Sequence, residues 1–476
     1  MENFKIIQVF KSFNRKDMKR FGEFIASPYF NKSKIIKELF EVFEKHHPGF
    51  DNRNFTLEKV YKKVFNDDKY DYHKIGNVIS DLYQLSEKFL AYHSIEKKEF
   101  YIERNIFNEL RNRGLYKIYE QKHSSYMKEL IDRKYKDEDY FYYLYEMSDE
   151  FLWYATLKKP NTELNILQTE FDQFFSYTLL RLLRFYNLML HERNQNNVNY
   201  RLTMFNEILN YVSNELTDQT PAIVVFKTIL LLLHTKDRKY YNDLWELKER
   251  YMDEFKSDDR NLIYMHLYDY AAYMVNFKGD DSYNRDMFKI YKEQIDKKIM
   301  IPEGFHYFNF VNIVKIACRV QEFEYAENFM KEFRSSIPKN EEINVMEFCY
   351  GTIENVKGNL QKALKHFSKT NFQNFILKVQ VKILLLKTYY KLGMFEQALG
   401  MIDSFRHFVL REENLLSEHK ESYTKFLILV GDLIRLKESH SKNTGFEVNK
   451  LKNDAELIPA NPFRVKAWLI EELKTL

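Results

Sequence analysis

Apolar residues recur every three or four positions along most of the chain, a spacing typical of amphipathic helices that pack on one another. Short polar connections separate these runs. One of them contains Gly393, between "VKILLLKTYY" and "FEQALGMIDSF". Glycine adopts the left-handed backbone that ends a helix at little cost. Since no paired-glycine or phosphate-loop motif surrounds Gly393, the pattern predicts the corner of a helical hairpin.

Three segments in the C-terminal half share this pattern and align on a common alanine. Five residues before each alanine stands a corner residue, and each corner lies between two apolar helical runs. The alanines are Ala326, Ala363 and Ala398, and the corner residues are Gln321, Gly358 and Gly393. A small residue where two helices cross allows their backbones to approach closely. The pattern therefore predicts stacked helical hairpins over residues 305–410.

These segments resemble the tetratricopeptide repeat (TPR) and its relatives. Gly351 matches the small residue where the first helix of a repeat meets its partner, and Pro338 matches the proline that ends a repeat. Over its whole length the chain resembles an uncharacterised group of bacterial helical-repeat proteins, through "SPYFNK" (27–32) and "AWL" (467–469). The resemblance implies an all-α, TPR-like solenoid with an N-terminal helical domain and a C-terminal capping helix. It implies no activity.

The predicted organisation has four parts. They are an N-terminal helical domain (1–95), long helices with degenerate repeats (96–300), TPR-like repeats (301–440), and a polar loop with a capping helix (441–476). Residues 224–251 and 273–295 have the form of degenerate hairpins, the second with Gly279 at its corner. The polar stretch 437–462 predicts a mobile loop. Asn461 and Pro462 then predict the start of the last helix, which packs Trp468 and Leu469 on the last repeat.

Composition supports helices and excludes several classes of protein. The chain has 12 Gly and 8 Pro in 476 residues, too few for a turn-rich β fold. Its 73 Lys and Arg and 69 Asp and Glu are interleaved, as expected for a solvated helical surface and not for a protein that coats nucleic acid. Two cysteines suit a reducing compartment. The absence of a signal-peptide core and of an apolar run of bilayer length predicts a cytoplasmic protein without membrane insertion.

No motif in the sequence predicts catalysis, a cofactor or a metal centre. None of the 13 histidines has a metal-ligand spacing: "HERNQ" at His191 lacks a second histidine, and the adjacent His46 and His47 diverge by about 100° on a helix. No nucleophile stands in a recognisable pairing with a base. These features predict a non-enzymatic protein.

One set of basic residues predicts a binding surface. Lys315 and Arg319 occupy the same places in the first helix of one repeat as Lys387 and Lys391 in another. Residues four apart share a helix face. In a TPR that face lines the concave groove, and Asn355 and Tyr390 are expected near it. Such a groove suits an acidic protein segment or the C-terminal carboxylate of a peptide. A solvated basic face is the alternative, since Thr352 and Val356 occupy these places in the middle repeat.

A second reading concerns nucleic acid. Residues 55–95 have the rhythm of a helix-turn-helix whose longer helix exposes four polar residues, and "KSFNRKDMKR" (11–20) supplies positive charge for phosphates. The four residues are Lys74, Asn77, Ser80 and Gln84. Asp71 and Asp81 on the same helix oppose this reading, and a helical packing domain is its structural alternative.

Overall fold

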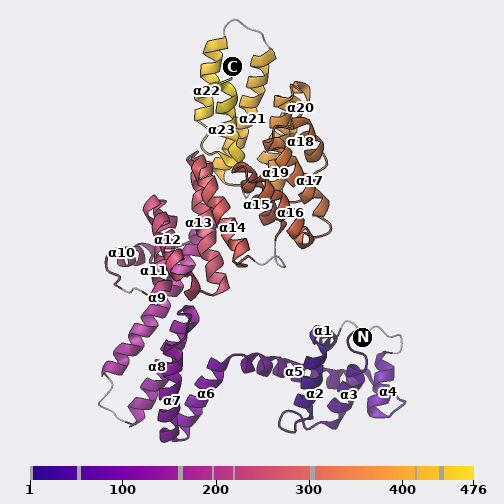
Figure 1. Cartoon of the computed structure of the whole chain (residues 1–476). Helices are drawn as coiled ribbons and strands as arrows, with labels where there is room; N and C mark the ends of the chain where they lie inside the picture. The colour runs from indigo at the N-terminus through magenta and orange to yellow at the C-terminus, as the bar shows by residue number, and fades with distance from the viewer. Residues whose placement is uncertain are drawn as a thin grey trace. The chain divides into compact units, whose positions relative to one another are not determined.

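The protein is all-α in its computed structural model. The structure describes residues 4–50, 55–158, 164–195, 198–217, 220–300, 306–412, 415–438 and 444–475, and these contain helices and no strand (Figure 1). The predicted all-α class is therefore confirmed. Two compact units are present: residues 1–131 with 146–170, and residues 132–145 with 171–476. No helix in the described part of the chain has the length and apolar character required to cross a bilayer.

The first unit begins with five helices that share one hydrophobic core. They are α1 (Lys5–Ser12), α2 (Arg15–Ala26), α3 (Lys34–Glu44), α4 (Leu57–Phe65) and α5 (Tyr72–Glu96). Phenylalanine dominates the core, with Phe10, Phe21 and Phe43 fully buried. The helices α6 (Glu99–Asn112) and α7 (Tyr116–Ile131) follow, and α8 (Glu138–Lys158) and α9 (Leu164–Gln195) contribute to both units.

Local capping explains where these first helices begin. The side chain of Asn14 accepts hydrogen bonds from the backbone at the start of α2, and Asp17 accepts one from the backbone of Asn14, so that the two residues form a capping box. The cap of α3 is Ser33, whose hydroxyl accepts from the backbone of Ile36. The buried side chain of Asn31 instead donates to the carbonyls of Ile25 and Ser33 and so closes the preceding turn.

The second unit continues as consecutive helices, most of which pack on a neighbour in the chain. They are α10 (Phe205–Asn214), α11 (Pro221–Thr235), α12 (Arg238–Tyr251), α13 (Ser257–Phe277), α14 (Asn284–Asp296), α15 (Tyr307–Arg319), α16 (Phe323–Phe333), α17 (Glu342–Val356), α18 (Leu360–Phe367), α19 (Phe375–Lys391), α20 (Phe395–Leu410), α21 (Ser417–Glu438), α22 (Thr444–Glu456) and α23 (Val465–Leu473). Two short 3₁₀ turns matter below: η2 (Asp281–Tyr283) and η5 (Pro462–Arg464).

The three aligned hairpins have the predicted corners. They are α15 with α16, α17 with α18, and α19 with α20. Backbone φ is +66° at Gln321, +84° at Gly358 and +71° at Gly393, so all three corner residues are left-handed. Gln321 therefore adopts the same geometry as the two glycines although it carries a Cβ. The alignment of a glutamine with two glycines thus reflects a shared conformation.

The small residues of the hairpins lie where helices meet. Ala326, Ala363 and Ala398 are fully buried. A Cβ on Gly351 would lie 2.7 Å from the Phe367 ring, a separation that atoms do not tolerate. The predicted role of Gly351, close contact between α17 and α18, is confirmed.

The two degenerate hairpins also turn where the sequence places their corners. Lys236, between α11 and α12, has φ of +57°, and the next residue, Asp237, caps α12 by accepting from the backbone of Lys239. Gly279, after α13, has φ of +72°. The repeated helix–corner–helix pattern thus extends to residues before 300.

The prediction of a mobile loop over 437–462 is wrong for residues 444–456, which form α22; residues 439–443 lie outside the described part of the chain. Leu451, Ala455 and Ile458 are spaced for one helix face, and they pack into a core with α21 and α23. The many polar residues around them conceal this narrow apolar stripe.

The terminal helix packs as predicted but begins later. Trp468 and Leu469 are buried in the same core as Tyr390 and Ala398 of the last aligned hairpin. The helix starts at Val465 and not at Pro462, because Phe463 and Arg464 both have positive φ and form η5. The side chain of Asn461 still accepts a hydrogen bond from the backbone of Ala467, at 3.0 Å.

Candidate functional site

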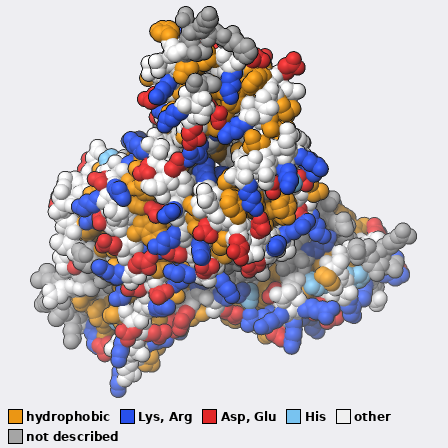
Figure 2. Space-filling view, turned by 45° about the horizontal axis from the view of Figure 1, so that its top comes forward, with side chains coloured by type: hydrophobic (Ala, Val, Ile, Leu, Met, Phe, Trp, Pro, Cys, Tyr) orange, Lys and Arg blue, Asp and Glu red, His pale blue; other side chains and the backbone are white. Residues whose placement is uncertain are grey.

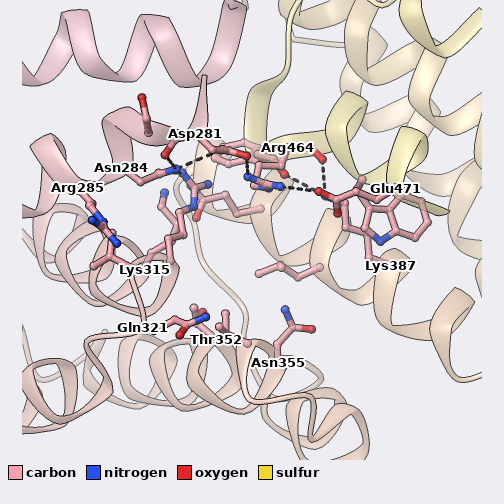
Figure 3. Close-up of a pocket in the computed structure, with 18 residues that line it drawn as sticks. Asp281, Asn284, Arg285, Lys315, Gln321, Thr352, Asn355, Lys387, Arg464 and Glu471 are labelled. Atoms are coloured by element: carbon pink, nitrogen blue, oxygen red, sulfur yellow. Dashed lines mark hydrogen bonds and ion pairs between the residues drawn. The ribbon is translucent and has the colours of Figure 1, made fainter. Parts of the chain in front are cut away.

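A cavity lined by charged and polar side chains lies in the second unit, among the first helices of the aligned hairpins. Its volume is about 820 Å³. The walls come from η2, α14, α15, α17 and α19, and the C-terminal segment η5–α23 closes one side (Figure 3). The closing segment is held in part by packing of η5 against α13, which is far from it in sequence. Four of the predicted contact residues line this cavity: Lys315, Arg319, Asn355 and Lys387.

Three basic side chains line the cavity without a carboxylate to balance them. The Lys315 ammonium donates to Asn312 Oδ1 at 2.8 Å, and Arg319 donates to Asn284 Oδ1 at 3.3 Å. The Lys387 ammonium donates to the carbonyls of Phe463 and Arg464, both at 3.0 Å. None of the three forms an ion pair within the described residues, so their hydrogen bonds orient the positive charges without neutralising them.

A fourth basic side chain, Arg464, is neutralised. Its guanidinium forms ion pairs with Asp281 of η2 and, at 2.7 Å, with Glu471 of α23 (Figure 3). These two carboxylates are the acidic residues of the cavity wall. Because both are engaged by Arg464, the cavity retains an excess of positive charge. By contrast, acidic and basic side chains alternate over the face shown in Figure 2.

The environment lowers the pKa of all three unpaired groups. Removal from water is the main cause of the lowered pKa of Lys315, and the charge of Arg319 adds to it. Desolvation also lowers the pKa of Lys387, with repulsion from Arg464 and Arg319. The pKa of Arg319 is lowered chiefly by desolvation as well. A bound anion would reverse these effects, since it would supply the missing opposite charge.

Two predicted contact residues lie elsewhere. Tyr390 is only 1% exposed and packs edge-on against Trp468 in the core behind the cavity, so its prediction as a groove residue is wrong. Lys391 lies one turn beyond Lys387 and pairs with Glu472 at 3.4 Å, outside the cavity lining. The role of Lys391 as a contact residue therefore stays a prediction.

The middle hairpin contributes to the same surface. Thr352 and Val356, which replace the basic residues there, line the cavity together with Asn355. In Figure 3 Thr352 and Asn355 lie across the cavity from Asp281 and Arg464. The middle hairpin has uncharged residues where the other two hairpins have basic ones. These uncharged residues form the neutral wall of the cavity.

Two basic residues of the cavity could not be recognised in the sequence. Arg285 belongs to α14, before the aligned hairpins, and Arg464 belongs to η5, after them. Neither follows the 35- to 37-residue spacing. Arg285 and Arg464 line the same cavity because the C-terminal segment η5–α23 folds back toward η2 and α14.

The nucleic-acid reading of residues 55–95 stays a prediction. Lys74, Asn77, Ser80 and Gln84 are exposed on α5, as that reading requires. The Lys74 ammonium, however, lies 4.4 Å from the centre of the Phe65 ring. Asp71 caps α5, and Asp81 remains exposed on the same helix. The surface is therefore of mixed charge.

Comparison with protein-family models and with curated proteins gave no match for this chain.

Proposed function

We propose that the protein is a non-enzymatic interaction scaffold whose TPR-like hairpins bind an acidic protein segment. The observation that supports this proposal is the cavity with three unpaired basic side chains, Lys315, Arg319 and Lys387. Carboxylates pair strongly with such groups, since hydrogen bonds between charged partners are the strongest that proteins form. The occupant is an Asp or Glu side chain, or the terminal carboxylate of a peptide.

The shape of the cavity supports a peptide segment as its ligand. Phe463 and Trp468 give it an apolar wall, and Asn355, Gln380 and Thr352 provide hydrogen-bonding groups along another. A peptide presents carboxylates, backbone amides and apolar side chains together, so it can satisfy both walls. The first helices of successive hairpins form the same surface in the TPR resemblance.

The test is selection of peptides from a random library with free C-termini, using the full chain as bait. We expect selected sequences to be rich in Asp and Glu. For a selected peptide, the variant Lys315→Gln with Lys387→Gln should lower the affinity at least about tenfold, or about 1.4 kcal/mol, because two charge-assisted contacts are lost. Fluorescence polarisation measures the affinity.

A matched control is Lys331→Gln, which removes one charge from the exposed face of α16 and should leave the affinity unchanged. The single variant Lys315→Gln keeps the Lys387 contacts that hold η5, and it should lose part of the binding with the cavity wall intact. Comparing peptides with free and amidated ends separates a terminal carboxylate from acidic side chains. Selection without acidic enrichment, or equal binding by the double variant and the control, would overturn the proposal.

Peptide binding should also depend on pH. Because burial lowers the pKa of Lys315 and Lys387 below the ordinary value of 10.5, each lysine loses its proton earlier in the free protein than in the complex. Binding therefore takes up protons, and affinity falls as pH rises through the interval between the free and bound pKa values. Calorimetry in buffers of different ionisation enthalpy measures this uptake. The Lys315→Gln, Lys387→Gln double variant should take up fewer protons than the unaltered protein.

A further inference from the structure

We propose that His191, His266 and Asp269 form a binding site for a divalent transition-metal ion of the zinc class. The three residues come from two helices of the second unit, α9 and α13. His266 and Asp269 are three residues apart on α13 and so share one helix face. One ligand atom of each residue lies within 4.8 Å of those of the other two.

The ligand atoms are buried, and one of them has no polar partner. Within the described residues, Nδ1 of His191, Nδ1 of His266 and Oδ2 of Asp269 are all inaccessible to solvent. His191 Nδ1 and Asp269 Oδ2 form an ion pair at 2.8 Å, whereas Nδ1 of His266 has no hydrogen bond. Buried polar atoms are nearly always satisfied, so the unpartnered nitrogen of His266 beside this pair indicates a missing ion or water.

The donor set fits a zinc-class ion. Two imidazole nitrogens and one carboxylate oxygen are ligands that such ions prefer, and three protein ligands leave a further position for water. In a tetrahedral site with Zn–N bonds of about 2.0–2.1 Å, ligand atoms are roughly 3.3 Å apart. Small side-chain rotations bring the three atoms to that separation, since the His191 and His266 rings already lie 5.7 Å apart and nearly perpendicular.

His266 is the most deeply buried of the three residues. Its side chain is 2% exposed, so its unpartnered nitrogen is shielded from water.

The surroundings hold a small cavity and several basic side chains. His266 lines a cavity of about 210 Å³, whose lining also includes Asn187, Arg181 and Arg184. The Lys236 ammonium interacts electrostatically with all three proposed ligands and so opposes a cation.

The experiment is a titration of the full chain, first freed of metal by a chelator, with Zn²⁺ against a chromophoric competitor. We expect one tight site per chain. His266→Gln and Asp269→Asn should each lower its affinity more than tenfold, whereas His407→Gln, on the exposed face of α20, should leave it unchanged. Lys236→Gln should tighten binding, since it removes the opposing charge. Circular dichroism in the presence of chelator checks that each variant is folded.

A measurement on the unaltered protein keeps the proposal testable if a variant fails to fold. X-ray absorption at the zinc edge should show only nitrogen and oxygen ligands, with histidine scattering. Sulfur ligands would assign the ion to Cys318 or Cys349 and overturn the proposal. Two other results would also overturn the proposal. One is the absence of a stoichiometric zinc site, and the other is a site whose affinity both His266→Gln and Asp269→Asn leave unchanged.

Discussion

Glu293→Gln should destabilise the region around α12, α13 and α14 by about 2–3 kcal/mol. The ammonium of Lys248 is 1% exposed and lies 2.5 Å from Glu293 Oε2, which also accepts a hydrogen bond from the Tyr264 hydroxyl at 3.0 Å. The glutamine keeps the size of the side chain and removes its charge. Lys248 would retain Glu249, at 2.7 Å, whose side chain is 60% exposed and therefore a weaker partner.

Hydrogen exchange of α12 to α14, followed by mass spectrometry, measures this loss locally in the full chain. Lys248→Met is the informative comparison, because it removes the same ion pair from the other side. In Lys248→Met, Glu293 keeps two neighbouring positive charges, Lys289 and Lys297, and its side chain is 19% exposed to water. The loss of stability should therefore be smaller than in Glu293→Gln. A larger loss for Lys248→Met than for Glu293→Gln would contradict this account of the ion pair.

Gly351→Val should destabilise the α17–α18 hairpin by about 2–3 kcal/mol. Any Cβ at this position lies 2.7 Å from the ring of Phe367, which is fully buried and has no room to move away. The two helices would have to separate, and the contacts of Ala363 in the same hairpin would loosen with them. Hydrogen exchange of α17 and α18 should rise, while exchange in α1 to α5 stays the same.

Gly400→Val is the matched control for this steric argument. Gly400 lies on the exposed face of α20, and nothing is within 4 Å of a Cβ built there. Valine has a slightly better helix propensity than glycine, so the change in stability should be less than about 0.5 kcal/mol. Equal losses at the two positions would show that valine acts through the helix backbone and not through contact with Phe367.

Sequence periodicity predicted the helices because each must bury a stripe of apolar residues, and the stripe is visible in one dimension. The hairpin corners were predictable for the same reason, even at Gln321, where alignment with Gly358 and Gly393 revealed a shared left-handed backbone. The stripe of α22 was missed, because Leu451, Ala455 and Ile458 are few and stand among charged residues. Only packing against α21 and α23 shows that they suffice.

The candidate site was half predictable. Lys315, Arg319 and Lys387 line one cavity, which the spacing of the repeats predicts. Tyr390 was misplaced because it packs against Trp468, which the terminal helix α23 brings to it. Arg464 reaches the cavity through a chain return that no local pattern encodes.

The cluster of His191, His266 and Asp269 could not be predicted from local sequence either, because its residues come from two helices. "HERNQ" lacks a second histidine, and the structure supplies His266 from α13, with Asp269 at a spacing of three. That spacing, "HLYD", was the only local signal of the cluster in the sequence.

The contact of η5 with α13 joins the two ends of the segment that carries the aligned hairpins. An open array of helical repeats has terminal units with a single neighbour, and it can gain or lose a unit by duplication or deletion with little effect on the others. Here Asp281 and Arg464 pair near the two ends of the segment from η2 to α23. Inserting or deleting a hairpin between them would therefore break this contact, a cost that an open array does not have.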